Sequence, residues 1–142
     1  MNFKIEWLLD ESEKATANSL LGDIRLSDEM HSIVEHSVYL DSWFEALLKA
    51  AQLRIDPETD VEIAIAEQPR PLRFWRNSAT RLHVMSHGKE IVIDSQDTFR
   101  NATQSAAQSF LNRAEALDDA PRNEVLKSIR KLLEQKPMTD GT

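Results

Sequence analysis

The chain contains no cysteine, and only three of its 142 residues are glycine. The lack of cysteine excludes disulfides, thiolate zinc sites and cysteine nucleophiles. With so few glycines, a glycine-rich loop that cradles a phosphate is excluded as well, and no serine lies in a GxSxG motif. No apolar run approaches the roughly 20 residues that a membrane-spanning helix needs. We therefore predict a protein that is not an enzyme and holds no cofactor or metal.

The composition is that of a soluble globular protein, with 41% hydrophobic and 29% charged residues. We expect one domain over residues 1–135 and a frayed tail over 136–142. The first residues, MNFKIEWLLDESEK, lack the basic start and long apolar core of a secretory signal. A cytoplasmic location and no membrane contact are therefore predicted.

The charge is distributed unevenly along the chain. The formal net charge is −7, yet residues 1–71 hold 15 acidic and 6 basic residues, whereas residues 72–142 hold 9 acidic and 11 basic ones. An acidic face built from the first half would repel nucleic acid and attract a basic protein. A chance variation in surface charge is the alternative explanation.

Alternation of apolar and polar residues predicts several strands. Phe3 to Leu9 alternate over one strand, and a short second strand follows Gly22. The segment 61–94 predicts an antiparallel meander of three or four strands, which ends in a tight hairpin at Gly88.

Helical periodicity is clear from Leu40 to about residue 53. Its start is ambiguous: one helix over 29–53, begun by Ser27-Asp28-Glu29, and a strand or turn near 31–36 before a shorter helix both fit. Further helices are predicted after Ser95 and over 121–134. This order predicts an α+β fold, in which helices pack on one face of an antiparallel sheet of about five to six strands.

A basic and aromatic strip lies within the predicted meander. Arg73 and Trp75 share one face of their strand, and His83 lies on the same outer face of the next. An arginine beside a tryptophan can stack on it, and such a platform can hold a base, a nucleotide or an aromatic side chain. The alternative is that these arginines neutralise acids elsewhere in the protein. The negative net charge argues against direct nucleic-acid binding.

The four histidines do not form a metal-binding motif. His31 and His36 are five residues apart, which places them on different faces of a helix, and His83 and His87 bracket a hairpin. No HExxH motif accompanies them. We interpret them as surface or hairpin histidines.

Four segments carry a resemblance to a known group of proteins. They are VYLDSWFEALLKA (38–50), PLRFWR (71–76), RLHVMSHGKEIVID (81–94) and AAQSFLNRA (106–114). Their pattern resembles small bacterial immunity proteins of polymorphic and contact-dependent toxin systems. The resemblance implies an inhibitor that blocks its toxin sterically and electrostatically, without catalysis. The helix predicted over 121–134 departs from it, because many such proteins lack this helix.

Small size, the lack of catalytic motifs and the acidic first half favour the same class, an immunity protein that binds a basic toxin domain. A secretion-type chaperone or adaptor is the alternative, and a small-ligand-binding domain that uses the basic strip is the third. We expect the partner-binding residues to be acids from loops and from the polar side of the first helix, around an aromatic or arginine anchor. They are Asp41, Glu45, Asp56, Glu58, Asp60, Arg73, Trp75 and His83.

Overall fold

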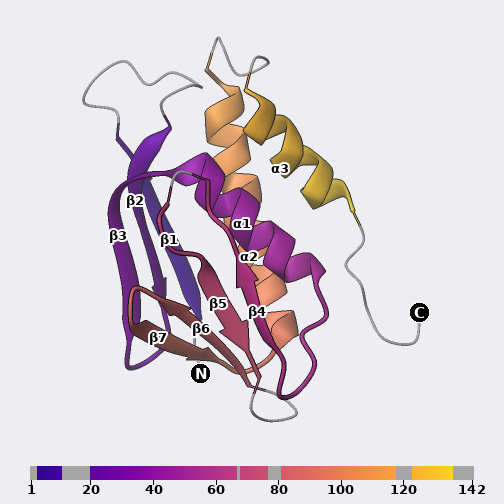
Figure 1. Cartoon of the computed structure of the whole chain (residues 1–142). Coiled ribbons are helices and arrows are strands. Elements are labelled where there is room, and N and C mark those ends of the chain that lie inside the picture. The colour runs from indigo at the N-terminus through magenta and orange to yellow at the C-terminus, as the bar shows by residue number, and fades with distance from the viewer. Residues whose placement is uncertain (1–2, 11–19, 67, 77–80, 118–122, 136–142) are drawn as a thin grey trace.

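Seven strands and three helices make up the described part of the chain, and the strands form two antiparallel sheets (Figure 1). The computed structural model describes residues 3–10, 20–66, 68–76, 81–117 and 123–135. The first sheet has the order β1 (Lys4–Leu9), β2 (Leu21–Ser27) and β3 (Ser32–Tyr39). The second has the order β4 (Asp60–Ile63), β5 (Leu72–Trp75), β6 (Leu82–Ser86) and β7 (Lys89–Ile93). The helices are α1 (Leu40–Gln52), α2 (Gln96–Glu115) and α3 (Glu124–Glu134).

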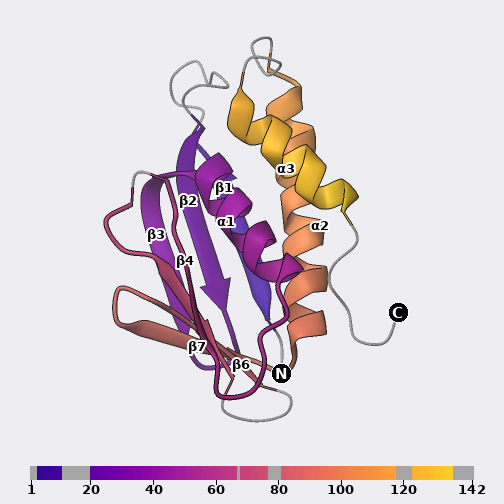
Figure 2. The same ribbon diagram turned by 45° about the vertical axis from the view of Figure 1, so that its right-hand side comes forward.

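The helices lie together on one side of the sheets (Figure 2). Helix α1 contacts β2 and β3 of the first sheet and β4 of the second, α2 contacts β1 and β7, and α3 packs on α1 and α2. One continuous hydrophobic core includes residues of both sheets and all three helices. The α+β class is therefore confirmed, but the expectation of a single sheet of five to six strands is wrong.

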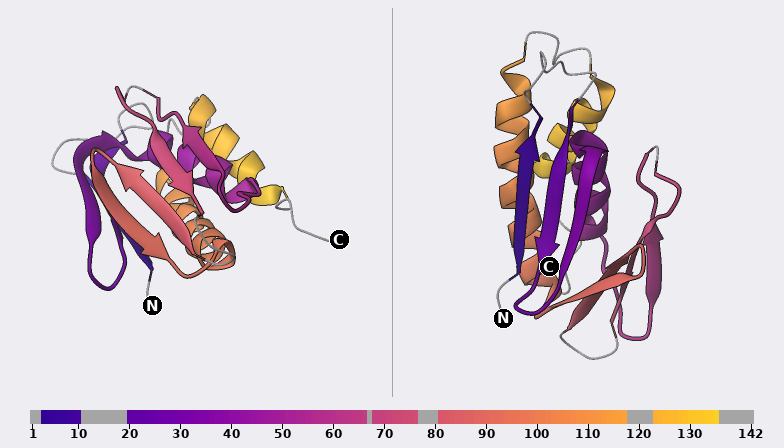
Figure 3. Two further views of the ribbon diagram at one scale, coloured as in Figure 1. Left: turned by 60° about the horizontal axis from the view of Figure 1, so that its bottom comes forward. Right: turned by 90° about the vertical axis from the view of Figure 1, so that its left-hand side faces the viewer.

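The two sheets meet at an angle along the edge strands β3 and β7, which are not paired as neighbouring strands (Figure 3). The side chain of Asp28, and not a ladder of backbone hydrogen bonds, links the two sheets at this point. The carboxylate of Asp28, in the turn between β2 and β3, accepts hydrogen bonds from the backbone N–H of Met30 at 2.7 Å and of His31 at 2.6 Å. It also accepts one from the N–H of Val92 on β7, at 2.8 Å. Asp28 thus takes up the N–H of Val92 at the edge of β7 that faces β3, and the two strands belong to different sheets.

These three donors also set the protonation of Asp28. Burial works to raise its pKa, but the N–H groups of Val92, Met30 and His31 outweigh burial, so the pKa lies below its ordinary value of 3.8. The charged form is therefore the one that the folded chain favours.

Replacing Asp28 with alanine is expected to lower the free energy of unfolding by about 2–3 kcal/mol at neutral pH, because three N–H groups lose a charged acceptor. The folded pKa is depressed, so the carboxylate stabilises the fold above pH 3.8, and this contribution is lost as the pH falls below that value. The gap in stability between wild type and Asp28→Ala should therefore shrink when urea denaturation is repeated at about pH 3. Glu134→Gln, at an exposed position in α3, is the control. A gap of the same size at both pH values would contradict this role.

The ambiguous segment after Ser27 forms a hairpin and not a helix. Asp28 caps the turn, and β3 follows it and leads directly into α1. A bulge near the end of β3 places Ser37 in the left-handed region, with φ 53°, where its N–H donates to Asp23 Oδ1 at 3.1 Å. The alternative with a strand and a shorter helix is therefore confirmed, and the helix start at Ser27-Asp28-Glu29 is wrong.

The predicted hairpin at Gly88 is confirmed. His87 and Gly88 form a two-residue turn with φ values of 49° and 77°, and Ser86 lies opposite Lys89. Two positive φ values are those of a type I′ turn, whose twist matches that of the flanking strands. The turn fixes the register of β6 against β7, and with it the side chains that share the outer face.

The start of α2 agrees with the sequence prediction, whereas the start of α3 differs from it. Ser95 caps α2 as predicted, and its hydroxyl accepts from the N–H of Thr98 at 3.1 Å. The last helix begins at Glu124 with Asn123 as its N-cap, later than the predicted start at 121, which lies outside the described residues. The tail predicted over 136–142 also lies outside them. Six large side chains of the three helices are buried, namely Trp43, Phe44, Leu47, Phe99, Phe110 and Ile129.

Candidate functional site

Three side chains stack on the outer face of the four-stranded sheet. Arg73 and Trp75 lie two residues apart on β5, and His83 lies directly opposite Trp75 on β6. The rings of Trp75 and His83 are stacked, with centroids 5.3 Å apart and an angle of 13° between their planes. The guanidinium carbon of Arg73 lies 5.5 Å from the centre of the Trp75 ring, within the range of a cation–π contact. The arrangement that the sequence predicts for these three residues is confirmed.

A carboxylate closes this stack at each end. On β4, Asp60 forms an ion pair with Arg73, and the hydrogen bond between them raises the pKa of Arg73 above its ordinary value. On β7, Oε1 of Glu90 lies 2.5 Å from Nδ1 of His83. The contacts thus run without a break across all four strands. We call these five residues the outer-face patch: Asp60, Arg73, Trp75, His83 and Glu90.

The patch surrounds an aromatic centre with paired charges. His83 stacks on the Trp75 indole and the Arg73 guanidinium lies over the same ring, so a partner can reach only the part of the indole that these two side chains leave exposed. The ion pair between Arg73 and Asp60 also agrees with the alternative that the arginine neutralises an acid. Fixed charges of both signs around an apolar ring favour recognition by shape and charge pairing.

The loop before β4 brings predicted acidic residues next to the patch. The N–H of Glu58 donates to the carbonyl oxygen of Arg76 at 2.7 Å, which places Glu58 beside the end of β5. The N–H of Thr59 donates to the carbonyl oxygen of Asp56 at 3.1 Å, and the carboxylate of Asp56 accepts from Arg54 at 2.9 Å. These bonds hold the loop in one conformation, so less entropy is lost when it binds.

One acid that the sequence analysis missed belongs to the same surface. Glu62 lies on β4 directly opposite Arg73 and is exposed. Asp56 and Asp60 already pair with arginines, whereas neither Glu58 nor Glu62 forms an ion pair with another residue that the structure describes. The charge of Glu62 still helps to raise the pKa of Arg73, and Glu58 and Glu62 add acidic charge beside the patch.

The two acids predicted on α1 lie elsewhere. Asp41 is only 7% exposed, contrary to the expectation that it lies on the polar side of the helix. Its carboxylate accepts from the N–H of Ser42 at 2.9 Å and from the side-chain amide of Asn123 at 3.3 Å. Burial raises the pKa of Asp41 above 3.8, although both hydrogen bonds oppose this. The start of α3 thus covers Asp41, and Glu45, half-buried near Lys49, does not reach the patch.

Each of the four histidines lies beside a carboxylate. His83 contacts Glu90 in the outer-face patch, and Nδ1 of His87 lies 2.8 Å from Glu35 on β3. The other two lie near aspartates, His36 at 3.3 Å from Asp23 and His31 at 3.9 Å from Asp28. Within the described residues, no group of three or more histidine and acidic side chains is arranged to hold a metal ion.

None of the helices in the described ranges is long and apolar enough to cross a membrane. No protein-family model, no curated protein and no solved structure matches the chain.

Proposed function

We propose that this chain is a non-enzymatic protein-binding module of the bacterial cytoplasm, and that it acts as an immunity protein which neutralises a toxin by covering its site. The binding surface is the outer-face patch together with the acidic loop before β4. Direct nucleic-acid binding is not part of the proposal, because the net charge is −7.

One observation carries this proposal: two sets of residues that are far apart in the sequence form one surface. Asp60, the first residue of β4 after the acidic loop, lies opposite Trp75 and pairs with Arg73. Binding energy in protein interfaces concentrates in tryptophan, tyrosine and arginine side chains that a rim of weaker contacts surrounds. Trp75 and Arg73 fit the centre of such an interface, and Glu58 and Glu62 fit its charged rim.

The rim charges favour a basic partner. Carboxylates that are not already paired attract a basic surface at long range and speed up association, and salt screens this effect. A nuclease or another toxin that acts on nucleic acid has a basic substrate cleft, and such a cleft matches an acidic rim around an aromatic anchor.

The test is to capture partners of the tagged protein from extract of its own cells and to measure binding kinetics. Trp75→Ala is expected to weaken binding of the captured partner by about 2 kcal/mol or more, as for a central hot spot. Glu58→Lys combined with Glu62→Lys should slow association, and the wild-type association rate should fall as salt rises. Co-expression of the wild type should protect cells from the partner.

The matched control reverses the same number of charges away from the patch, with Glu6→Lys on β1 and Glu134→Lys on α3. Both positions are exposed, and this variant should associate at nearly the wild-type rate. If no protein is retained and a nucleotide or metabolite raises the melting temperature instead, the inhibitor proposal fails. The small-ligand alternative at Arg73, Trp75 and His83 then takes its place.

A secretion-type chaperone or adaptor is the second candidate, and the angle between the two sheets favours it. Proteins of that class pack helices on a strongly bent sheet, and here α1 contacts strands of both sheets. The capture experiment separates the two candidates, because a chaperone retains a segment of a secreted protein, whereas an inhibitor retains a folded toxin domain.

A further inference from the structure

A pocket of about 200 Å³ lies on the four-stranded sheet, next to the outer-face patch. Three of its lining residues form a row of directly opposed positions across three strands: Glu62 on β4, Arg73 on β5 and Met85 on β6. Residues just before β5 and in the β6–β7 turn complete the lining, namely Arg70, Pro71, His87 and Gly88. We call it the turn pocket. Because Arg73 belongs to both, the pocket adjoins the patch directly.

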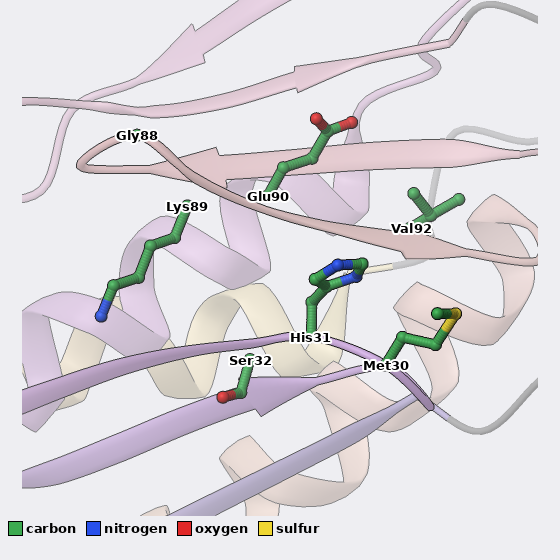
Figure 4. Close-up of a pocket in the computed structure, with 7 residues that line it drawn as sticks. All are labelled: Met30, His31, Ser32, Gly88, Lys89, Glu90 and Val92. Carbon is green, nitrogen blue, oxygen red and sulfur yellow. The ribbon is translucent and has the colours of Figure 1, made fainter.

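Gly88 also lines a larger hollow of about 570 Å³, between β7 and the β2–β3 turn (Figure 4). Contacts between the two sheets lie at both ends of this hollow, Asp28 with Val92 and Glu35 with His87, and leave no room for an added chain. The turn pocket is smaller and suits a single side chain. A cavity of about 150 Å³ is enough to hold a benzene ring.

The charges around the turn pocket favour an occupant of neither sign. Arg73 is already paired within the patch, and a carboxylate of β3 lies 2.8 Å from Nδ1 of His87. Two charged lining residues remain, Glu62 and Arg70, and Arg70 forms no ion pair with any residue that the structure describes. Glu62 would repel a carboxylate in the pocket, and the two arginines would repel an ammonium group. A neutral side chain is therefore favoured.

Among neutral side chains, the lining favours an aromatic ring. Met85 is half-buried on β6, and a thioether sulfur makes favourable contacts with aromatic rings. Arg70 is exposed, and its planar guanidinium can lie over the face of a ring, where the π electrons attract a cation. An aliphatic side chain would fit the same space but would gain nothing from the guanidinium.

We propose that the turn pocket receives one phenylalanine or tyrosine side chain of the protein partner. This inference rests on the proposed function and deepens it, because it names the side chain with which the partner anchors itself beside Trp75. His83 and Arg73 already cover part of Trp75, so the pocket supplies the concave site that the stack lacks. Aromatic side chains that fill such sites dominate the energy of many interfaces.

The probe is N-acetyl-L-phenylalanine amide, titrated into the full chain labelled with ¹³C-methyl methionine. The methyl signal of Met85 should shift saturably, with a dissociation constant on the order of 1 mM for so small a ligand. The methyl signal of Met30, which is 84% exposed and lines the other hollow, should not shift (Figure 4). N-acetyl-L-cyclohexylalanine amide has a similar size but no π system, and it should bind about two- to fivefold more weakly.

A pair of arginine variants isolates the guanidinium. Arg70→Gln should bind the phenylalanine probe about two- to fivefold more weakly than wild type, but the cyclohexylalanine probe equally well. The matched control is Arg25→Gln, at an exposed position on β2 of the other sheet, and it should bind both probes as wild type does.

Three results would overturn the proposal. They are no saturable shift of the Met85 signal, equal affinity of wild type for the two probes, and an Arg70→Gln variant that binds both probes less well to the same degree or neither less well. The first two use wild type alone, so they decide the matter even if Arg70→Gln disturbs the turn.

The probes need no partner, so the two proposals can fail separately. If a toxin is captured but the Met85 signal does not shift, the aromatic anchor is wrong and the proposed function stands. If the signal shifts as expected but no protein is retained from the extract, the proposed function fails and the aromatic preference of the turn pocket stands.

Discussion

Replacing Phe110 with alanine is expected to lower the free energy of unfolding by about 3–5 kcal/mol, the range for truncating a buried phenylalanine. Phe110 on α2 is fully buried. Its ring stacks on Phe44 of α1, with centroids 4.9 Å apart, and meets Trp7 of β1 edge-on at 5.5 Å. The truncation would remove contacts to two other elements at once and leave a cavity where they meet.

The measurement is urea denaturation of Phe110→Ala beside Ser109→Ala, its neighbour on the exposed side of α2. Ser109→Ala should unfold within about 0.5 kcal/mol of wild type, as surface substitutions usually do. A Phe110→Ala variant that unfolds at the same urea concentration as wild type would place Phe110 outside the core.

The sequence predicted most elements because their signals are local. Apolar residues recur with a period of two in β1 and in the meander, and with the helical period in α1, α2 and α3. The hairpin at Gly88 follows from residues that are adjacent in the chain, since a type I′ turn needs positive φ at both central positions. Such patterns need no knowledge of the tertiary structure.

The division into two sheets was not predictable in this way, because the contacts where the sheets meet join residues that are distant in the sequence. Asp28 and Val92 are 64 residues apart, and nothing near either one indicates that a carboxylate caps the edge of β7. Similarly, Ile33 and Val34 fit a helix as well as a strand. The hydrogen bond from the Ser37 N–H to Asp23 across the bulge belongs to the strand form, and no local pattern indicates it.

Only part of the candidate site could be predicted, because the rest depends on contacts between residues that are distant in the sequence. Strand alternation was enough to place Arg73, Trp75 and His83 on one face, but finding Glu62 and Glu90 requires the register between strands. Asp41 was misplaced because helical periodicity tells which side of α1 is polar, but not that α3 covers that side.

Replacing Gly22 with alanine is expected to destabilise the fold by about 3 kcal/mol, at the upper end for overpacking. Gly22 is buried in β2, and a Cβ there would lie 2.2 Å from the carbonyl oxygen of Leu8 and 2.7 Å from Cδ1 of Leu40. The nearer atom belongs to the backbone of the adjacent strand, so no change of rotamer relieves the clash. To make room, β1 would have to move away from β2 at the point where the first sheet meets the start of α1.

The control is Gly88→Ala, because the two glycines differ in why they are needed. A Cβ at Gly88 meets nothing within 4 Å, but its φ of 77° disfavours a side chain, so the cost there is conformational, about 1 kcal/mol. Urea denaturation should therefore place Gly22→Ala well below Gly88→Ala in stability, and hydrogen exchange in Gly22→Ala should speed up first in β1 and β2. Equal stability of the two variants would mean that β1 moves away at little cost, and that the close approach at Gly22 does not hold the first sheet against α1.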